Sequence, residues 1–232
     1  MVESNTKGSR KRILALVSNT DTPLPASVLH TSLLTWPTRR LFHRIHREAY
    51  RPNQFNDTAR GNARFSPIVD LAGSVIPTLY GGATFDCSAM ETVFHDIPFA
   101  PGYKTFDKQK LIGIVHSRLL PLNALQLVDL RTKALRKLGV RRAELIDTEQ
   151  DRYPKTRLWA EAIHAQCPEA QGMCWTSRQD DSAEAIVLFG DRIASSDLET
   201  VDGPTPLLGD ESTYDAVLSL ADRIGVNVVS GR

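Results

Sequence analysis

The sequence lacks the short motifs that identify several common enzyme classes. It has no Gly-x-Gly-x-x-Gly at a strand-to-helix turn and no Gly-x-x-x-x-Gly-Lys-Ser/Thr, so it does not support those two types of nucleotide site. The Gly-x-Ser-x-Gly turn of many hydrolases is also absent. Because there is no His-Glu-x-x-His and no paired Cys-x-x-Cys, we expect no metal.

The chain is also poor in cysteine, net charge and long apolar runs. Its three cysteines leave one unpaired in any disulfide scheme, which favours a reducing, cytoplasmic location. A net charge of +1 gives no reason to expect nucleic acid or an anionic membrane as a partner. No apolar run reaches the length of a membrane span, and the run at 13–17 is too short for a secretory signal. We expect a disordered basic start followed by a short strand or helix.

The remaining pattern predicts an α+β protein with a mostly antiparallel sheet, since the predicted strands outnumber the helices and do not alternate with them. Helices are predicted at 132–138, closed by Gly139, and at 154–167, where Pro154 lies in the first turn. An amphipathic helix is predicted at about 213–224, after a proline-containing linker at 202–206. Strands are predicted at 41–47, 76–80, 111–115, 125–130, 172–177 and 185–189.

Chemistry-bearing residues gather in the stretch 61–91. Arg64 lies in a loop-like segment, and the strand at 76–80 ends in Tyr80. The pair Gly81-Gly82 is expected to break that strand, and Asp86 or Ser88 to open a helix that carries Glu91. This order would place a cation, a phenol and a carboxylate together, which suits a phosphate-bearing ligand on which a positive charge develops.

These parts resemble, in type and order, the RES family, named for an arginine, a glutamate and a serine. The resemblance covers roughly residues 41 to 193, with Ala63 and Phe65 where the family usually has glycine and tryptophan. The segments that carry it are Phe42-His43-Arg44-Ile45, Gly61-Asn62-Ala63-Arg64-Phe65, Leu79-Tyr80, Ala89-Met90-Glu91, Tyr153-Pro154-x-Thr156 and Gly172-Met173-Cys174-Trp175-Thr176-Ser177.

The resemblance implies a fold like that of the ADP-ribosyltransferases, with a split, mostly antiparallel sheet and flanking helices. It implies consumption of NAD+ as substrate, by phosphorolysis or hydrolysis of the nicotinamide-ribose bond, with inorganic phosphate as a candidate co-substrate. It also implies the toxin of a type II toxin–antitoxin pair, with a small helical antitoxin of the Xre type as partner. We expect an N-terminal extension at 1–40, the RES-type domain at 41–196, and a linker and packed helix at 197–232.

The resemblance assigns roles to five residues. Arg44 and Arg64 would bind phosphates, because a guanidinium group offers a planar fork of donors. Tyr80 would position nicotinamide, and Glu91 would stabilise the ribose cation. Ser177 would donate to a phosphate or fix Glu91.

Each assignment has an ordinary structural alternative. Tyr80 would be an edge residue of the core with its hydroxyl in water, and Ser177 would be a turn residue at a strand end. The arginines would be surface residues with solvated head groups, and Arg47 and Arg51 compete with Arg44. Ser88-Ala89-Met90-Glu91 fits a capping box, in which Glu91 only closes a helix start; a helix that begins at Asp86 would leave Glu91 available. Trp175 is expected in the core or the pocket wall.

Two other functions fit the same residues. One is an ADP-ribosyltransferase that modifies a macromolecule. The other is a non-catalytic module that keeps the fold and binds NAD+ or a partner without turnover.

Overall fold

The computed structural model describes residues 21–231, so the expectations for residues 1–20 lie outside the described part of the chain. The main feature is one curled sheet of eight strands, whose neighbours are antiparallel except for β8 and β9. In spatial order the strands are β1 (Leu33–Trp36), β8 (Leu125–Asp129), β9 (Gly172–Thr176), β10 (Glu184–Phe189), β5 (Thr78–Gly82), β2 (Phe42–Arg47), β7 (Ile114–Pro121) and β11 (Leu198–Pro206). The predicted α+β class with a mostly antiparallel sheet is confirmed; its likeness to ADP-ribosyltransferases stays a prediction.

Strand pairing is least extensive in the middle of the sheet. There β2 pairs with β5 at a single register position, His43 opposite Gly82. On one side of this position β7 and β11 continue the sheet from β2, and on the other side β10 continues it from β5. Beyond His43 the two strands separate, and side chains of both strands line the pocket described below.

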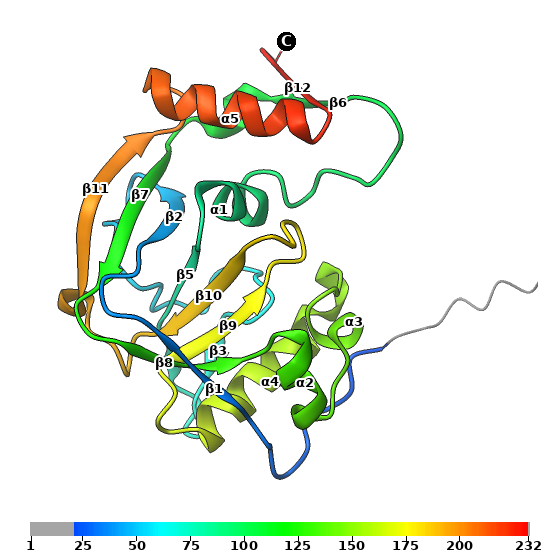
Figure 1. Cartoon of the computed structure of the whole chain (residues 1–232), viewed down its shortest axis with the longest axis vertical. Coiled ribbons are helices and arrows are strands. Elements are labelled where there is room, and N and C mark those ends of the chain that lie inside the picture. Colours follow the sequence, from blue (N-terminus) through cyan, green and yellow to red (C-terminus); the bar gives the residue numbers. More distant parts are fainter. Residues whose placement is uncertain (1–20, 232) are drawn as a thin grey trace, which may run out of the picture.

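The helices lie at two ends of the curled sheet (Figure 1). One end carries α5 (Glu211–Arg223) over the parallel pair β6 (Lys104–Asp107) and β12 (Val226–Val229). The other end carries α2 (Thr132–Leu138), α3 (Arg142–Leu145) and α4 (Tyr153–Gln166), with α1 (Phe85–Thr92) between the ends. Short elements complete the described chain: β3 (Ile68–Val69) paired with β4 (Val75–Ile76), and the 3-10 turns η1 (Lys108–Leu111), η2 (Gln150–Arg152) and η3 (Ser195–Asp197).

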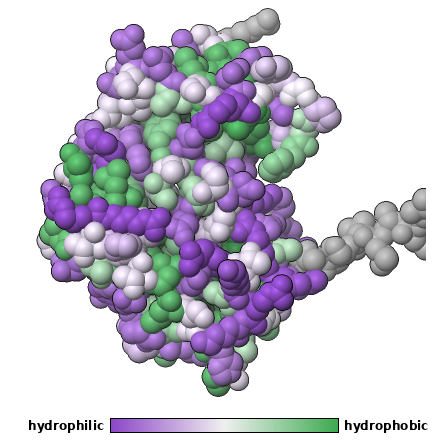
Figure 2. Space-filling view, in the orientation of Figure 1, coloured by the Kyte–Doolittle hydropathy of each residue, from purple (hydrophilic) through white to green (hydrophobic). Residues whose placement is uncertain are grey.

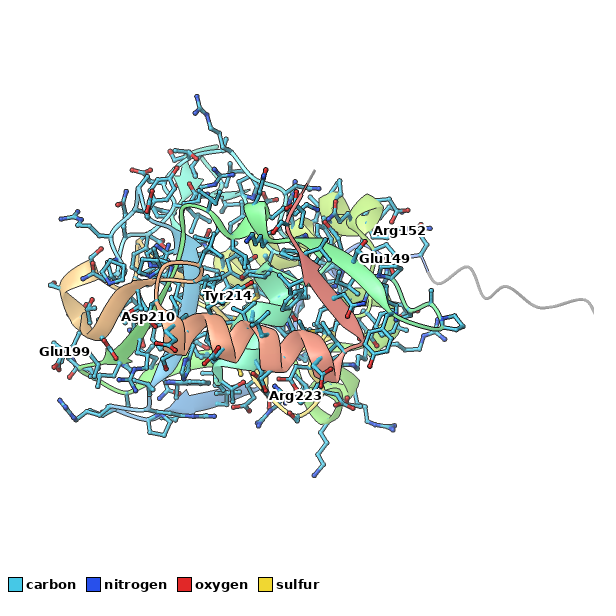
Figure 3. The ribbon with its side chains drawn as sticks, turned by 90° about the horizontal axis from the view of Figure 1, so that it is seen from above. Glu149, Arg152, Glu199, Asp210, Tyr214 and Arg223 are labelled. Atoms are coloured by element: carbon cyan, nitrogen blue, oxygen red, sulfur yellow. The ribbon has the colours of Figure 1, made fainter. Side chains whose placement is uncertain are left out.

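Helix α5 is fixed at both of its ends (Figure 3). The Asp210 side chain caps its start by accepting from the amide of Thr213 at 2.8 Å. Arg223 in its last turn forms an ion pair with Asp86 of α1 at 2.5 Å. The apolar face of α5 buries Val217 and Leu220 against the cluster that contains Phe94 of the segment after α1. The predicted amphipathic helix is therefore confirmed. Through the ion pair with Asp86 it contacts α1, the helix that carries Glu91.

Several predicted elements are confirmed with small shifts of their ends. Helix α2 ends at Gly139, which has the left-handed φ of 81° expected of a C-terminal cap. Helix α4 begins one residue earlier than predicted, at Tyr153, and strands β2, β8, β9 and β10 lie where the pattern placed them.

Four details of the prediction are wrong. The strand expected at 111–115 is a 3-10 turn followed by β7, and the linker expected at 202–206 belongs to β11, which pairs with β7. Strand β5 runs through Gly81 and Gly82 instead of ending before them. At Gly82 a Cβ would lie 2.8 Å from the amide nitrogen of Ser88, so the glycine allows α1 to approach the strand.

The start of α1 is the fourth correction. Neither Asp86 nor Ser88 opens the helix: Thr84 is its N-cap, and the Thr84 hydroxyl accepts from the amide of Cys87 at 3.0 Å. Glu91 is consequently the next-to-last residue of α1, too far from the N-cap to belong to a capping box.

The described part of the predicted N-terminal extension is built into the sheet. Strand β1 pairs with β8, and Trp36 at its end is fully buried. Its indole Nε1 donates to the carbonyl of Arg40 at 3.0 Å, which fixes the turn that leads into β2.

Candidate functional site

A pocket of about 320 Å³ opens between the two ends of the curled sheet, on the side where the space-filling view is notched (Figure 2). We call it the inner pocket. Its volume is near the lower limit of small-molecule sites, which span about 300–1,000 Å³. The residues that line it are Ile45, Asn62, Ala63, Arg64, Tyr80, Gly81, Ser88, Glu91, Thr92, His95, Asp96, Glu149, Gln150, Tyr153, Trp175, Arg178, Gln179 and Ala185.

The lining of the inner pocket divides by burial and polarity. Ile45, Ser88, Trp175 and Ala185 are buried, and we call them the floor because they present mostly apolar atoms; Arg64, at the wall beside them, is equally buried. His95, Asp96 and Glu149 belong to exposed or partly exposed segments at its mouth. The floor therefore differs in polarity from the mouth of the pocket.

Glu91 enters this pocket because α1 is held tightly against the sheet. The buried Ser88 hydroxyl donates to the carbonyl of His43 on β2 at 2.6 Å, and Gly82 on β5 leaves room for the helix start. One turn further along α1, Glu91 is partly buried and lines the pocket. The split between β2 and β5 thus places the carboxylate beside the pocket floor.

Ser177 supports Glu91 from behind. Its hydroxyl is fully buried and donates to Glu91 Oε1 at 2.5 Å. Ser177 Oγ in turn accepts from the amides of Gln179 and Asp180, both at 3.0 Å. A serine hydroxyl has one proton and two acceptor positions. Both acceptor positions are filled and the proton is donated to Glu91, so the hydroxyl has no hydrogen-bonding capacity left in this structure. These contacts favour the predicted support of Glu91 over the predicted phosphate contact, and both roles stay predictions.

Tyr80 contributes its ring to the pocket while its hydroxyl is engaged on the other side. The hydroxyl accepts from the amide of Phe65 at 3.0 Å, and burial raises the pKa of Tyr80 to about 12. Its ring lies edge-on to Trp175 with centroids 6.2 Å apart. The phenol stays protonated and is already hydrogen-bonded, so Tyr80 presents its ring to the pocket; its role toward nicotinamide stays a prediction.

Arg64 is at the pocket wall but is not a free cation. It is 5% exposed, and its Nη1 donates to the carbonyl of Ile146 and to the Thr148 hydroxyl, the latter at 2.9 Å. Arg178 reaches the same segment and donates to the carbonyl of Thr148 at 2.7 Å and to Glu149. Two guanidinium groups therefore converge on residues 146–149 at the edge of the pocket.

Arg44 lies outside the inner pocket. Its guanidinium Nη1 donates to the carbonyls of Pro52 and Gln54, at 2.5 and 2.8 Å, and burial lowers its pKa to about 10. It lines a separate hollow of about 220 Å³, which shares Ile45, Ala63 and Tyr80 with the inner pocket. We call this the outer hollow. The contacts of Arg44 favour a structural role, and its role in phosphate binding stays a prediction.

Cys87 and His95 are two further residues near Glu91 whose side chains could take part in chemistry. Cys87 is a buried residue of α1 and does not line the inner pocket; burial raises the pKa of its thiol to about 12, so it is a poor nucleophile. His95 does line the pocket mouth, where its carbonyl accepts from the Gln179 amide group at 3.0 Å. That contact ties the end of α1 to the turn that follows β9.

Sequence reasoning missed Arg178 and Tyr153 as pocket residues, and it assigned no ligand contact to Trp175. Arg178 follows Ser177 directly, so its nearness to the pocket was readable from the chain. The ring of Tyr153 lies 5.3 Å from the guanidinium carbon of Arg64, a contact between segments nearly ninety residues apart that no local pattern carries.

The described residues hold no group of three or more His, Cys, Asp or Glu side chains arranged for a metal ion. Within the same part of the chain, no helix has both the length and the apolar character needed to cross a membrane.

Comparison with known proteins adds one match. The model of the RES domain matches residues 41–208, which span the site and the whole eight-stranded sheet except β1. No curated protein and no solved structure matches the chain.

Proposed function

This chain belongs to the RES domain family, which is associated with NAD-related toxin function, and on that premise we propose that it degrades NAD+ by cleaving the nicotinamide-ribose bond. The proposed products are nicotinamide and either ADP-ribose or its phosphorylated form. The observation that carries the proposal is the contact between the Ser177 hydroxyl and Glu91 at the wall of a pocket with an apolar, aromatic floor.

The chemistry requires a fixed carboxylate. When the bond between C1′ of the ribose and the pyridinium nitrogen breaks, both bonding electrons go to nitrogen, and nicotinamide leaves as a neutral molecule. The ribose is left with a positive charge shared between C1′ and the ring oxygen, as in glycoside cleavage. A carboxylate held in place before the reaction stabilises that charge without having to reorganise. Glu91 has this character because Ser177 orients it through Oε1.

The acceptor then attacks C1′ and completes the reaction. Water would give ADP-ribose and release a proton, whereas inorganic phosphate would give the 1-phosphorylated sugar. The two outcomes use the same Glu91 and differ only in what reaches the ribose cation.

The rest of the dinucleotide would extend from the floor to the mouth. Nicotinamide is flat and would lie on the floor beside Tyr80 and Trp175. The pyrophosphate would lie toward Arg64 and Arg178, where the guanidinium groups add positive charge to the pocket edge. Arg44 lies in the outer hollow, and its predicted phosphate contact is not required by this arrangement.

The proposed biological role is that of a toxin whose expression depletes cellular NAD+, with a small helical antitoxin of the Xre type as the partner that blocks the pocket. Expression of the chain in a bacterium should lower cellular NAD+ and stop growth, and Glu91→Gln should relieve both effects at equal protein level.

The direct test incubates purified protein with NAD+, with and without inorganic phosphate, and separates the products by chromatography. Release of nicotinamide that depends on Glu91 supports the proposal, and the accompanying sugar product identifies water or phosphate as the acceptor. NAD+ labelled in the adenosine part covers the transferase alternative, because label on protein or nucleic acid would replace small products. Intact NAD+ with a folded wild-type protein would leave the binding-module alternative.

A further inference from the structure

A second pocket adjoins the inner pocket at its mouth. It has a volume of about 640 Å³ and lies between the end of α1, the connection from α1 to β6, and β6 itself. In Figure 1 this connection arches outward at the end of the sheet that carries α5. Thr92, His95 and Asp96 line both cavities, so the two are neighbours at this edge.

The inner pocket alone offers little room for a whole dinucleotide. At about 320 Å³ it is near the lower limit of small-molecule sites, whereas NAD+ consists of two nucleotides joined through a pyrophosphate. With nicotinamide and its ribose beside Glu91, the adenosine has to lie outside. Two of the cavities described here border the inner pocket: the second pocket at the mouth, and the outer hollow beside Ile45, Ala63 and Tyr80.

The contacts around Arg178 indicate which of the two cavities the adenosine would reach. The residue after Arg178, Gln179, donates through its side-chain amide to the carbonyl of His95 at 3.0 Å. Gln150, which follows the segment that Arg178 contacts, donates to Asp96 Oδ1 at 3.3 Å. Arg178 therefore lies on the side of the mouth that borders the second pocket. The outer hollow is smaller, at about 220 Å³, and Arg178 does not line it.

The second pocket offers an accessible aromatic ring and positive charge. Tyr103, which lines it, is 68% exposed. Lys104 and Lys110 line it as well, and neither forms an ion pair within residues 21–231. Among the described residues that line the pocket, Asp96 at the shared edge is the one acid. A ring on which a flat base can stack, next to cations that can face a phosphate, suits a purine nucleotide.

Building on the proposed function, we propose that the second pocket binds the adenosine of NAD+, with the adenine stacked on the ring of Tyr103. The pyrophosphate then spans the mouth, between Arg178 on one side and Lys104 and Lys110 on the other. Tyr103 is thereby a specificity-determining residue that favours the dinucleotide over nicotinamide mononucleotide, which carries no adenosine. The adenine takes no part in bond cleavage, so a stack that is the same in the ground and transition states affects KM rather than kcat.

Phe99 provides a matched control for Tyr103. Both are exposed aromatic residues of the connection between α1 and β6, and Phe99 is 88% exposed, but Phe99 does not line the second pocket. Because neither ring is buried, we expect Tyr103→Ala and Phe99→Ala to fold like the wild type. The two variants remove the same kind of side chain from the same segment and differ in whether the second pocket loses a wall.

The first test titrates adenosine monophosphate into the protein and needs no turnover. The Kd from proton–nitrogen NMR should rise about tenfold in Tyr103→Ala, a moderate effect for the loss of one base stacked on an aromatic ring. Phe99→Ala should bind like the wild type, and so should Arg60→Ala, which changes the lining of the outer hollow instead. Absence of binding to the wild type, an unchanged Kd in Tyr103→Ala, or a rise in Arg60→Ala alone overturns the inference.

The second test compares substrates. For NAD+, KM should rise about tenfold in Tyr103→Ala while kcat stays within about twofold of the wild type. For nicotinamide mononucleotide, kcat/KM should be the same in the variant and the wild type, because this substrate does not reach the second pocket. Phe99→Ala should leave both substrates unaffected. A loss in Tyr103→Ala that is equal for the two substrates contradicts a contact with the adenosine.

The outcomes separate this inference from the proposed function. If wild-type protein cleaves NAD+ and Tyr103→Ala leaves both KM for NAD+ and the binding of adenosine monophosphate unchanged, the role of the second pocket is wrong and the proposed function stands. If NAD+ stays intact while adenosine monophosphate binds and Tyr103→Ala weakens it, the adenosine site stands and the proposed catalysis fails. If NAD+ stays intact and adenosine monophosphate does not bind, both are wrong.

Discussion

The inner pocket and the outer hollow lie side by side and share Tyr80, yet they use their arginines in different surroundings. Arg64 in the inner pocket and Arg44 in the outer hollow both donate to main-chain carbonyls of a loop. In the inner pocket an oriented carboxylate, Glu91, shares the cavity with the arginine. The residues that line the outer hollow include two arginines and no Asp or Glu.

The comparison of the inner pocket with the outer hollow shows that a buried arginine does not by itself mark a reaction centre. A guanidinium group that satisfies carbonyls inside the fold acts first as a clamp for the loop that it reaches. What distinguishes the inner pocket is an acid whose orientation is fixed by Ser177 while the cavity beside it stays accessible. Variants that separate these two kinds of region are the most direct way to test the comparison.

The largest expected effect belongs to Glu91. Glu91→Gln keeps an oxygen that accepts from Ser177 but removes the negative charge, so kcat for NAD+ cleavage should fall by about 100-fold or more. The melting temperature should change little, because the hydrogen bond at 2.5 Å has a partner in both proteins. Nicotinamide release by chromatography measures the effect, with Glu169→Gln at an exposed position as the matched control. Undiminished cleavage in Glu91→Gln would remove the distinction between the two regions.

The next effect belongs to Arg44 and concerns stability. Arg44→Met leaves the carbonyls of Pro52 and Gln54 without their shared donor, so the free energy of unfolding should fall by about 2–4 kcal/mol. For a chain of this size that corresponds to a drop in melting temperature of roughly 5–15 °C. KM for NAD+ should stay within about threefold of wild type. A large rise in KM at unchanged melting temperature would restore the predicted phosphate contact.

Much of the fold was readable from the chain because it depends on local patterns. Helix α2 needs only its apolar spacing and Gly139, and the strands β8 and β10 are short apolar runs between turn residues. The course of β5 through Gly81 and Gly82 was not readable. Glycines usually interrupt a strand, and the reason for Gly82 is the approach of Ser88 from another element, which only the folded chain reveals.

The site divides in the same way. The order of the motifs singled out Arg64, Tyr80, Glu91 and Ser177, and the structure brings the first three to one pocket with Ser177 behind Glu91; their roles stay predictions. The partners of the guanidinium groups could not be predicted. Most of them are main-chain carbonyls, which every residue carries, and those of Arg64 lie more than eighty positions away in the chain.

A smaller effect on activity is expected at Ser177. Ser177→Ala removes the proton that orients Glu91 and the acceptor shared by the amides of Gln179 and Asp180. The charge of Glu91 remains, so kcat should fall only about tenfold, less than in Glu91→Gln. Binding of nicotinamide, followed by NMR, should be unchanged because the pocket floor is intact. A loss of nicotinamide binding as large as the loss of kcat would make Ser177 a structural residue only.

The smallest expected effect concerns the outer hollow and is a change in how protein stability depends on pH. His46 lines the outer hollow, where burial and the charge of Arg44 lower its pKa to about 4. The unfolded chain binds a proton at this histidine near pH 6.5, before the folded chain does, so its contribution to stability is complete above pH 6.5 and is lost as pH falls toward 4. The pKa of His116 on β7 is also lowered to about 4, by burial and by the nearby His43, so its contribution to stability is lost over the same pH range.

Thermal unfolding at pH 7.5 and pH 5.5 measures this loss. His46→Gln should flatten the dependence of the melting temperature on pH by the share of one histidine, because glutamine can replace its hydrogen bonds to Ser117 and the carbonyl of Arg47 but cannot bind a proton. Nicotinamide binding at pH 7.5 should be the same in the variant and the wild type, since His46 does not line the inner pocket. An unchanged slope would mean that His46 has similar proton affinity in the folded and unfolded chain, and acid sensitivity would then have to originate elsewhere than in the outer hollow.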